Sequence, residues 1–167
     1  MAQDVGEQVL SCFWDLASLE QATQVSAATS LANAVEESQK DVPTKASTAT
    51  LDESLAQCSQ LSSYVLQRLC RGLASSREGA RQGFSVGLAL VLQKLSFVSP
   101  SQAVELLEST LEKPRGQKGE EVRDYLLALL FGAGAIARSR GKGLGSLSAA
   151  EARPLAALIL STGQKKA

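Results

Sequence analysis

The chain has 167 residues, of which 44% are hydrophobic and 4% aromatic, and it contains no histidine. This length suffices to bury one hydrophobic core, and the apolar share excludes wholesale disorder. Few aromatic residues together with abundant Ala, Leu, Ser, Gln and Glu favour helices over strands. Without histidine the chain lacks the commonest general base and the commonest metal ligand, which counts against an enzyme.

The net charge is zero, but the two parts of the chain differ in sign. Residues 1–60 carry nine acidic and two basic side chains, a net charge of −7, and the remainder therefore carries +7. This asymmetry indicates one acidic and one basic face, and a basic face can meet phosphate or an acidic protein. Ordinary solvated helix surfaces explain the pattern equally well.

The three cysteines, Cys12, Cys58 and Cys70, have neither disulfide-framework nor zinc-site spacing, so we interpret them as small buried hydrophobes in a reducing compartment. Apolar stretches are interrupted well before the roughly 18 residues of a transmembrane span. Asp4 and Glu7 precede any hydrophobic run, unlike the basic start of a secretory signal. The sequence predicts an intracellular protein that makes no membrane contact.

Residues 1–37 are predicted to form a pair of helices, because apolar residues recur at spacings of three and four. These residues are Leu10, Phe13, Trp14 and Ala17 in the first helix and Val25, Ala28, Leu31, Ala32 and Val35 in the second. Residues 38–50 lack this periodicity and contain Pro43, which predicts a flexible surface loop.

A helical hairpin from Leu61 to Leu95 is the clearest local prediction. An apolar stripe at spacing four marks its first helix: Leu61, Val65, Leu69 and Leu73. Ser75 and Glu78 have the spacing of a capping box, which predicts the start of the second helix. Two helices joined by so short a turn must lie antiparallel.

Further helices are predicted after the hairpin. The segment 99–102 (Ser-Pro-Ser-Gln) suits the start of a helix that ends before Pro114. Residues 122–136 outline a long amphipathic helix, glycines then interrupt the pattern, and a last helix is expected to begin near Ser148.

About seven helices are therefore expected, with residues 51–163 as a solenoid core and residues 164–167 as a basic tail. Successive helix pairs with short links favour an all-α, HEAT- or armadillo-like α-solenoid, whose repeats need not resemble one another in sequence. A compact helical bundle is the alternative.

Two glycine-rich segments invite comparison with nucleotide-binding motifs. Residues 132–137 (Gly-Ala-Gly-Ala-Ile-Ala) match the dinucleotide fingerprint, but the fingerprint requires a preceding strand, and the run before it is rich in Leu and Ala. Close approach of two helices explains these small residues better. Residues 141–146 fail the P-loop pattern, because Ile136 replaces its first glycine and no Ser or Thr follows Lys142. We predict no catalytic residue, metal site or cofactor.

Seven basic residues form the candidate site for nucleic acid or a protein partner: Arg68, Arg71, Arg77, Arg81, Arg138, Arg140 and Lys142. Arg68 and Arg71 are one helical turn apart, as are Arg77 and Arg81, so each pair is predicted to share a helix face. No aromatic residues alternate with them to stack bases, which weakens the nucleic-acid hypothesis. Pairing with neighbouring acids such as Glu78, or capping of helix C-termini, is an equally weighted alternative.

Three blocks of sequence carry a family resemblance. They are residues 13–18 (Phe-Trp-Asp-Leu-Ala-Ser), residues 64–85, and residues 118–125 with 130–132. In the second block a helix ends in Arg-Gly-Leu, a Ser-Ser-Arg turn follows, and an Ala-Arg-x-Gly-Phe-Ser helix begins. The blocks resemble, in the same order, the N-terminal part of the Myb-binding protein 1A family, also called the DNA polymerase phi or fifth DNA polymerase family.

The resemblance implies an armadillo- or HEAT-like protein of the nucleus and nucleolus. Such a scaffold would serve rDNA transcription, ribosome biogenesis and transcriptional co-regulation through protein partners, namely transcription factors and ribosome assembly factors. Nonspecific contact with rDNA or rRNA is left open, and no small-molecule substrate is implied. DNA polymerase activity, as in the family's name, and a generic helical adaptor are the alternatives.

The resemblance also implies a longer relative, because family members are several times longer and have an acidic stretch and a basic C-terminal tail. A solenoid cut short exposes an apolar end face, so we expect self-association of this chain in isolation.

Overall fold

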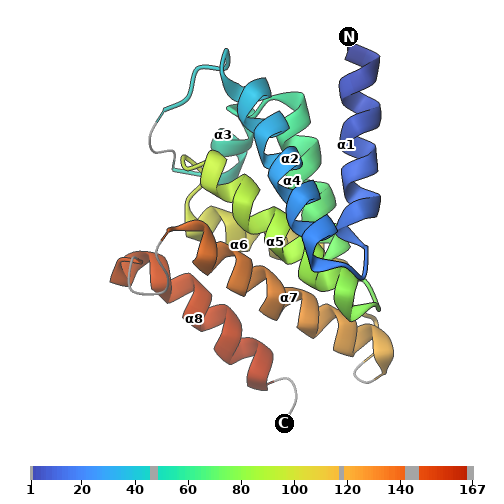
Figure 1. Cartoon of the computed structure of the whole chain (residues 1–167). Coiled ribbons are helices and arrows are strands. Elements are labelled where there is room, and N and C mark those ends of the chain that lie inside the picture. The colour runs from blue at the N-terminus through green and yellow to red at the C-terminus, as the bar shows by residue number, and fades with distance from the viewer. Residues whose placement is uncertain (1, 46–48, 117–118, 142–146, 165–167) are drawn as a thin grey trace.

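The computed structural model describes residues 2–45, 49–116, 119–141 and 147–164, and within these ranges it contains eight helices and no strand. The helices, coloured along the chain in Figure 1, are α1 (Ala2–Leu16), α2 (Gln21–Gln39), α3 (Leu51–Ala56), α4 (Gln60–Gly72), α5 (Glu78–Lys94), α6 (Pro100–Thr110), α7 (Glu120–Ser139) and α8 (Ala149–Gln164). The predicted all-α class is confirmed. No helix in these ranges combines the length and the apolar character needed to cross a membrane.

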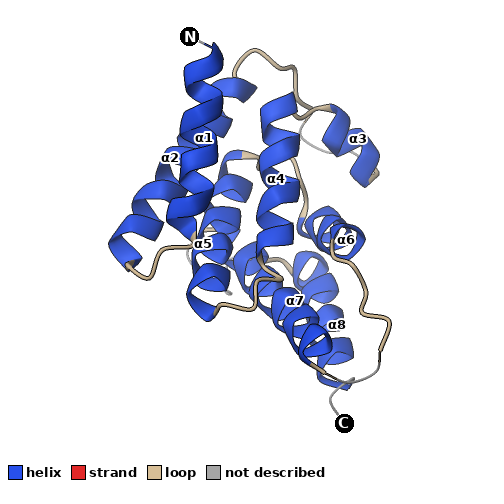
Figure 2. Ribbon diagram, turned by 90° about the vertical axis from the view of Figure 1, so that its right-hand side faces the viewer, coloured by secondary structure: helices blue, strands red, loops and turns tan. Residues whose placement is uncertain are grey.

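The helices pack as successive pairs, α1 with α2, α4 with α5 and α6 with α7. The second helices of these pairs, α2, α5 and α7, also pack on one another in chain order, and α8 lies against α6 and α7. Figure 1 shows α2, α5, α7 and α8 following one another, and Figure 2 shows α4 between α1 and α6. Because α5 contacts α1, α2, α4 and α7, it lies at the centre of the fold.

Eight helices replace the roughly seven predicted, because the stretch after Leu51 contains two. Ser59 Oγ accepts a hydrogen bond from the amide of Ser62 (3.0 Å) and so starts α4 shortly after α3 ends. The side chain of Gln39 holds this break: it accepts from the amide of Ser59 (3.0 Å) and donates to the carbonyl of Gln57 (2.6 Å). The break depends on a contact with α2, which apolar periodicity does not encode.

Reciprocal capping boxes start α3 and α6. Thr50 Oγ1 accepts from the amide of Glu53 (3.2 Å) and Ser99 Oγ from the amide of Gln102 (3.2 Å), and in each case the longer side chain accepts from the N-cap amide. The start of α6 is therefore confirmed. Gln102 also accepts from Ser54 Oγ (2.8 Å), which joins the buried ends of α6 and α3.

The capping box predicted at Ser75 and Glu78 is wrong. Helix α5 begins at Glu78, and its N-cap is Arg77, which makes no side-chain cap hydrogen bond. Ser75 Oγ accepts instead from the amide of Arg77, two residues further on (3.3 Å). Ser75 thus stabilises the turn between α4 and α5, a local bond that competes with helix capping.

Three residues assigned to the apolar faces of the first two helices are exposed: Leu10 (45%), Trp14 (76%) and Val25 (51%). Helix α1 instead buries a neighbouring stripe that includes Val9 and Phe13. Spacings of three and four fit both stripes, so periodicity alone did not decide which stripe faces the core.

The chain between α1 and α2 lies very close to α5. A Cβ atom at Gly83 would be 1.9 Å from the carbonyl oxygen of Leu16, so only glycine permits this approach. The buried side chain of Gln24 donates to the carbonyls of Ser18 (2.6 Å) and Gly79 (2.8 Å). These bonds hold the start of α5 against the turn between α1 and α2.

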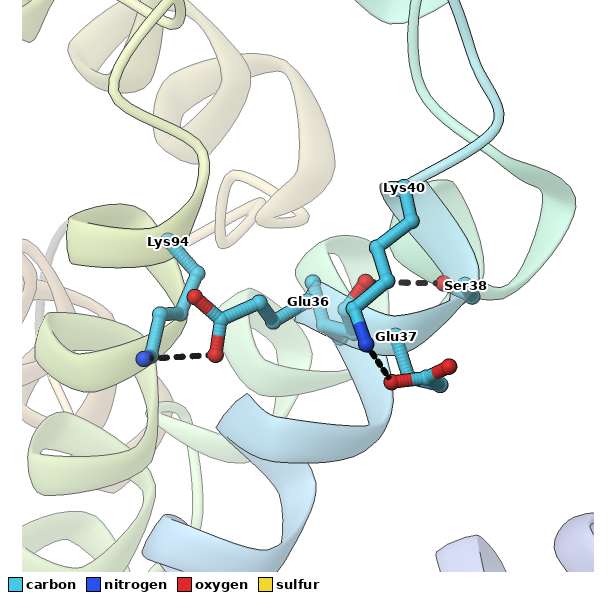
Figure 3. Close-up of polar contacts among 6 residues, drawn as sticks. Glu36, Glu37, Ser38, Lys40 and Lys94 are labelled. Atoms are coloured by element: carbon cyan, nitrogen blue, oxygen red, sulfur yellow. Dashed lines mark hydrogen bonds and ion pairs between the residues drawn. The ribbon is translucent and has the colours of Figure 1, made fainter.

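An ion pair joins the other ends of α2 and α5. Lys94 Nζ lies 2.8 Å from Glu36 Oε2, and both side chains are partly exposed (Figure 3). The neighbouring Glu37 pairs with Lys40, the residue that follows the last residue of α2. Exposed pairs contribute only about 0–1 kcal/mol, so apolar packing dominates the α2–α5 contact.

Helix α8 begins where the sequence predicted. Ser148 Oγ accepts from the amide of Glu151 (3.3 Å), whose carboxylate accepts from the amide of Ser148 (3.0 Å). Pro154 lies within this helix. Gln164 ends α8, and the rest of the predicted basic tail lies outside the described residues.

Candidate interaction site

One groove brings together three of the seven predicted basic residues. Arg68 and Arg71 come from α4 and Arg77 from the turn before α5, and all three line a cavity of about 370 Å³. Trp14 of α1 also lines it and is 76% exposed. We call this cavity, between α1 and the α4–α5 hairpin, the arginine groove.

Aromatic rings form the floor of the arginine groove. Phe13 of α1 stacks on Phe84 of α5, with centroids 6.4 Å apart and planes 13° apart, and meets Tyr64 of α4 edge-on at 6.1 Å. Gly72 permits this arrangement, because a Cβ there would lie 2.2 Å from the ring of Phe84. The hairpin therefore closes tightly beneath the groove.

The arginines of the groove are not neutralised by acidic neighbours. The guanidinium carbon of Arg68 lies 4.8 Å from the ring centroid of Phe13, a cation–π contact. The side chains of Arg71 and Arg77 form no hydrogen bond or ion pair with the residues that the structure describes. No carboxylate lines the groove in these parts of the chain, so three positive charges face one apolar floor.

Arg81 does not line the groove, so the structure does not bring it together with Arg77 in the candidate site. Arg77 is the N-cap residue of α5 and has an extended backbone (φ −89°, ψ 122°), so helical spacing alone does not fix the direction of its side chain. The Arg81 side chain is 8% exposed, donates to the carbonyl of Ser75 (2.6 Å) and lies 3.6 Å from Asp124 Oδ1. Intramolecular pairing therefore describes this arginine, with Asp124 rather than Glu78 as its partner.

The other predicted basic residues belong to the C-terminal end of α7. Arg138 donates to Ser85 Oγ of α5 (2.6 Å), and Arg140 donates to backbone carbonyls in the 96–98 segment. Burial lowers the pKa of the Arg140 guanidinium. Lys142 lies outside the described residues. None of the residues that line the arginine groove comes from α7.

The aromatic residues of the groove did not enter the predicted site. Trp14 and Phe13 are more than fifty positions from Arg68 and Arg71 in sequence, and helical periodicity does not report contacts between helices. One signal was available, since adjacent residues on a helix point about 100° apart. Only one residue of the Phe13-Trp14 pair can be fully buried against the core, and the other is left for a surface role.

The nucleotide-binding alternative does not fit the structure. Residues 132–137 lie inside α7, and no strand precedes them in the described part of the chain. A Cβ at Gly132 would lie 2.4 Å from Leu107 Cδ2, so this glycine lets α6 approach α7. Gly134 has only the guanidinium of Arg138 nearby, at 3.8 Å. The described residues also contain no group of three potential metal ligands.

Residues 64–167, which contain most of the α4–α5 hairpin and all that follows it, match the family model described as DNA polymerase phi. The chain belongs to the DNA polymerase phi family. Over 93 residues it is 37% identical to the rDNA transcriptional regulator pol5 of Schizosaccharomyces pombe, and this alignment covers 56% of the present chain and 10% of that protein. Over 86 residues it is 36% identical to the rDNA transcriptional regulator POL5 of Saccharomyces cerevisiae, and this alignment covers 42% of the present chain and 8% of that protein.

This member of the DNA polymerase phi family spans about a tenth of the length of those two relatives. No solved structure matches it. The matched range contains Arg68, Arg71 and Arg77, whereas Phe13 and Trp14 lie before it. The family resemblance predicted from the sequence is thereby confirmed for the blocks that begin at Tyr64.

Proposed function

We propose that this chain is a non-catalytic helical scaffold that acts in rDNA transcription, in the nucleus and nucleolus, through protein partners. The observation that carries the proposal is its membership of the DNA polymerase phi family together with its similarity to two rDNA transcriptional regulators. Transcription factors and ribosome assembly factors are the partners that such a scaffold would hold. The chain contributes one module to this activity, since it spans about a tenth of those relatives.

The packing of the helices supports a scaffold of the HEAT or armadillo type. The second helices of the three helix pairs stack in chain order, α2 on α5 and α5 on α7. A stack of this kind presents long, continuous surfaces formed by successive helices, and proteins use such surfaces to bind other proteins. We therefore infer an α-solenoid in preference to a closed bundle.

The chemistry of the carboxylates supports a non-catalytic role. Polymerase chemistry requires convergent carboxylates that hold metal ions. Asp124, the single aspartate after residue 60, lies 3.6 Å from Arg81 and 3.3 Å from Arg123 through the same Oδ1 atom. Its position is explained by ion pairing.

Chromatin immunoprecipitation and pulse labelling of pre-rRNA test the proposed function in the cells that express the protein. We expect the tagged protein to be enriched at rDNA over a protein-coding control locus. Its depletion should lower the synthesis of pre-rRNA while synthesis of messenger RNA from the control locus is maintained. Absence of rDNA enrichment together with unchanged pre-rRNA labelling would refute the proposal.

Primer extension tests the alternative polymerase activity. The purified chain, supplied with primed template, deoxynucleotides and Mg²⁺, should give no extension above a heat-denatured control. Extension that is abolished in the Asp124→Asn variant, while that variant remains folded, would replace the scaffold with an enzyme.

A further inference from the structure

We propose that the arginine groove binds a short acidic segment of a partner protein, with one apolar side chain of that segment seated on the aromatic floor. This inference rests on the proposed scaffold function and names the chemistry of one of its partners. The carboxylates of the segment would flank the apolar side chain and meet Arg71 and Arg77 on the rim of the groove.

The side chains of the groove are those that concentrate binding energy in protein interfaces. Tryptophan, tyrosine and arginine are enriched among residues whose truncation costs an interface most. Trp14 lines the groove and is 76% exposed, and Tyr64, which meets the ring of Phe13 edge-on but does not line the groove, is 42% exposed. A partner that covers the exposed surface of this tryptophan lowers the free energy of the complex, because burial of apolar area is favourable.

The charge of the groove selects an acidic occupant. Its lining contains three arginines and no aspartate or glutamate in the described parts of the chain. The neighbouring acid, Glu78, accepts a hydrogen bond from Gln82 (3.4 Å) and does not pair with the groove arginines. Arg71 and Arg77 therefore present guanidinium groups that are free to bind carboxylates with two hydrogen bonds each.

The same observations favour a protein segment over a nucleic acid. The chain has a net charge of zero and a pI near 6.3, whereas nucleic-acid-binding domains carry a strong basic excess. The basic residues of the α7 end do not line this groove, so no continuous basic track follows a phosphate backbone. A cavity of about 370 Å³ has room for one or two side chains rather than a run of bases.

Trp14 provides the readout, because it is the only tryptophan in the chain and lies on the wall of the groove. The probe is a peptide of about ten residues, made of Asp and Glu with a central Leu-Phe pair and without Trp or Tyr. Titration of this peptide into the whole chain should change the Trp14 emission in a saturable way. Binding should weaken as NaCl rises from about 50 to 500 mM, because exposed charges are screened.

Matched variants locate the binding. Arg77→Glu should weaken the apparent affinity for the peptide by at least about tenfold, because it places a carboxylate where one is to be bound. Arg153→Glu on α8, which changes the net charge equally on an exposed arginine outside the groove, should leave the affinity within about twofold. A peptide with Ser-Ser in place of Leu-Phe should bind at least about fivefold more weakly, since its apolar anchor is lost. Circular dichroism confirms that both variants are folded.

Three outcomes would overturn the inference: an unchanged Trp14 emission, an equal loss of affinity in both arginine variants, or full affinity of the Ser-Ser peptide. A single-stranded oligo(U) RNA of about twelve nucleotides that binds more tightly than the peptide and displaces it would assign the groove to nucleic acid instead. The proposed function is judged separately by rDNA occupancy and pre-rRNA synthesis. Loss of peptide binding with intact rDNA occupancy therefore refutes the groove alone, and the reverse result refutes the scaffold function alone.

Discussion

The contact between α1 and α5 at Gly83 permits a sharp prediction about what holds the fold together. Replacing Gly83 by alanine places a methyl group 1.9 Å from the carbonyl oxygen of Leu16 and 2.8 Å from its carbonyl carbon. Ordinary van der Waals contact begins near 3.4 Å, so the backbone at Leu16 must recede by about 1.5 Å. No change of side-chain rotamer relieves a clash with backbone atoms.

The expected magnitude follows from two opposing terms. Alanine in a helix interior is favoured over glycine by about 1 kcal/mol. Overpacking typically costs about 1–3 kcal/mol and occasionally more, and here it also disturbs the two hydrogen bonds of Gln24, which lies within 3.1 Å of the added methyl group. Because the clash is with backbone atoms, we take the upper end of the overpacking cost, about 3 kcal/mol, and subtract about 1 kcal/mol for helix propensity. We therefore expect Gly83→Ala to lower the free energy of unfolding by about 2 kcal/mol.

Gly134→Ala is the matched control, because it makes the same substitution within a helix at a site where only a guanidinium lies nearby, at 3.8 Å. It should raise the free energy of unfolding by about 0.5–1 kcal/mol. Urea unfolding followed by far-ultraviolet circular dichroism measures both variants. If Gly83→Ala is as stable as the unmodified chain, or if the two variants change stability in the same direction, the close approach of α1 and α5 is refuted.

Three further predictions test the buried ion pair, a helix cap and a buried thiol. Asp124→Asn should lower the free energy of unfolding by about 1–3 kcal/mol, because Arg81, whose side chain is 8% exposed, loses its counter-charge. Arg123→Gln, on the exposed side of the same aspartate, should lower it by less than about 1 kcal/mol. Equal effects of the two variants would contradict the burial of the Arg81–Asp124 pair. Ser99→Ala should cost about 1 kcal/mol in urea unfolding through loss of the α6 capping box, whereas the exposed neighbouring change Ser101→Ala should be nearly neutral. Burial raises the pKa of the Cys70 thiol from its ordinary value of 9.0 to about 12. Between these two values the thiol is ionised in the unfolded chain and protonated in the folded one. The stability that the protonated thiol contributes is therefore complete below pH 9 and is lost as pH rises towards 12. Urea midpoints between about pH 8 and 10.5 should therefore fall more steeply for the unmodified chain than for Cys70→Ala, and parallel slopes would contradict the burial of this thiol.

The sequence predicted most helices of this fold, and the errors have physical causes. Helix existence depends on local propensity and on apolar spacing, which the stretches around Leu31, Leu69 and Leu129 display clearly. The break between α3 and α4 depends on hydrogen bonds from Gln39, a residue about twenty positions away. Which apolar stripe of α1 is buried depends on where α2 and α5 lie, so Trp14 could not be assigned to the surface from its own helix.

The composition of the candidate site turned on where a single helix begins. A capping box at Ser75 would place Arg77 within the helix, and helical spacing would then put Arg77 and Arg81 on one face. Because α5 begins one residue after Arg77, Arg77 is an extended N-cap residue, and it lines the arginine groove whereas Arg81 does not. Arg81 forms an ion pair with Asp124 between α5 and α7, and Arg77 lines the arginine groove with Arg71.

The position of Arg77 before α5 also bears on the aromatic residues, which belong to the site although the sequence around the arginines contains no stacking pattern. Arg77 lines the groove together with Phe13 and Trp14 of α1, a helix that precedes the matched family range. The groove therefore requires two segments that are more than fifty residues apart. If the arginine groove is a binding site, Trp14→Ala in the whole chain should weaken binding of the acidic peptide, because Trp14 lines the groove and is 76% exposed. A labelled peptide measures this loss by fluorescence anisotropy, and circular dichroism confirms that the variant is folded. Full affinity of Trp14→Ala would show that the arginines act without the aromatic wall of α1 and would refute it as part of the site.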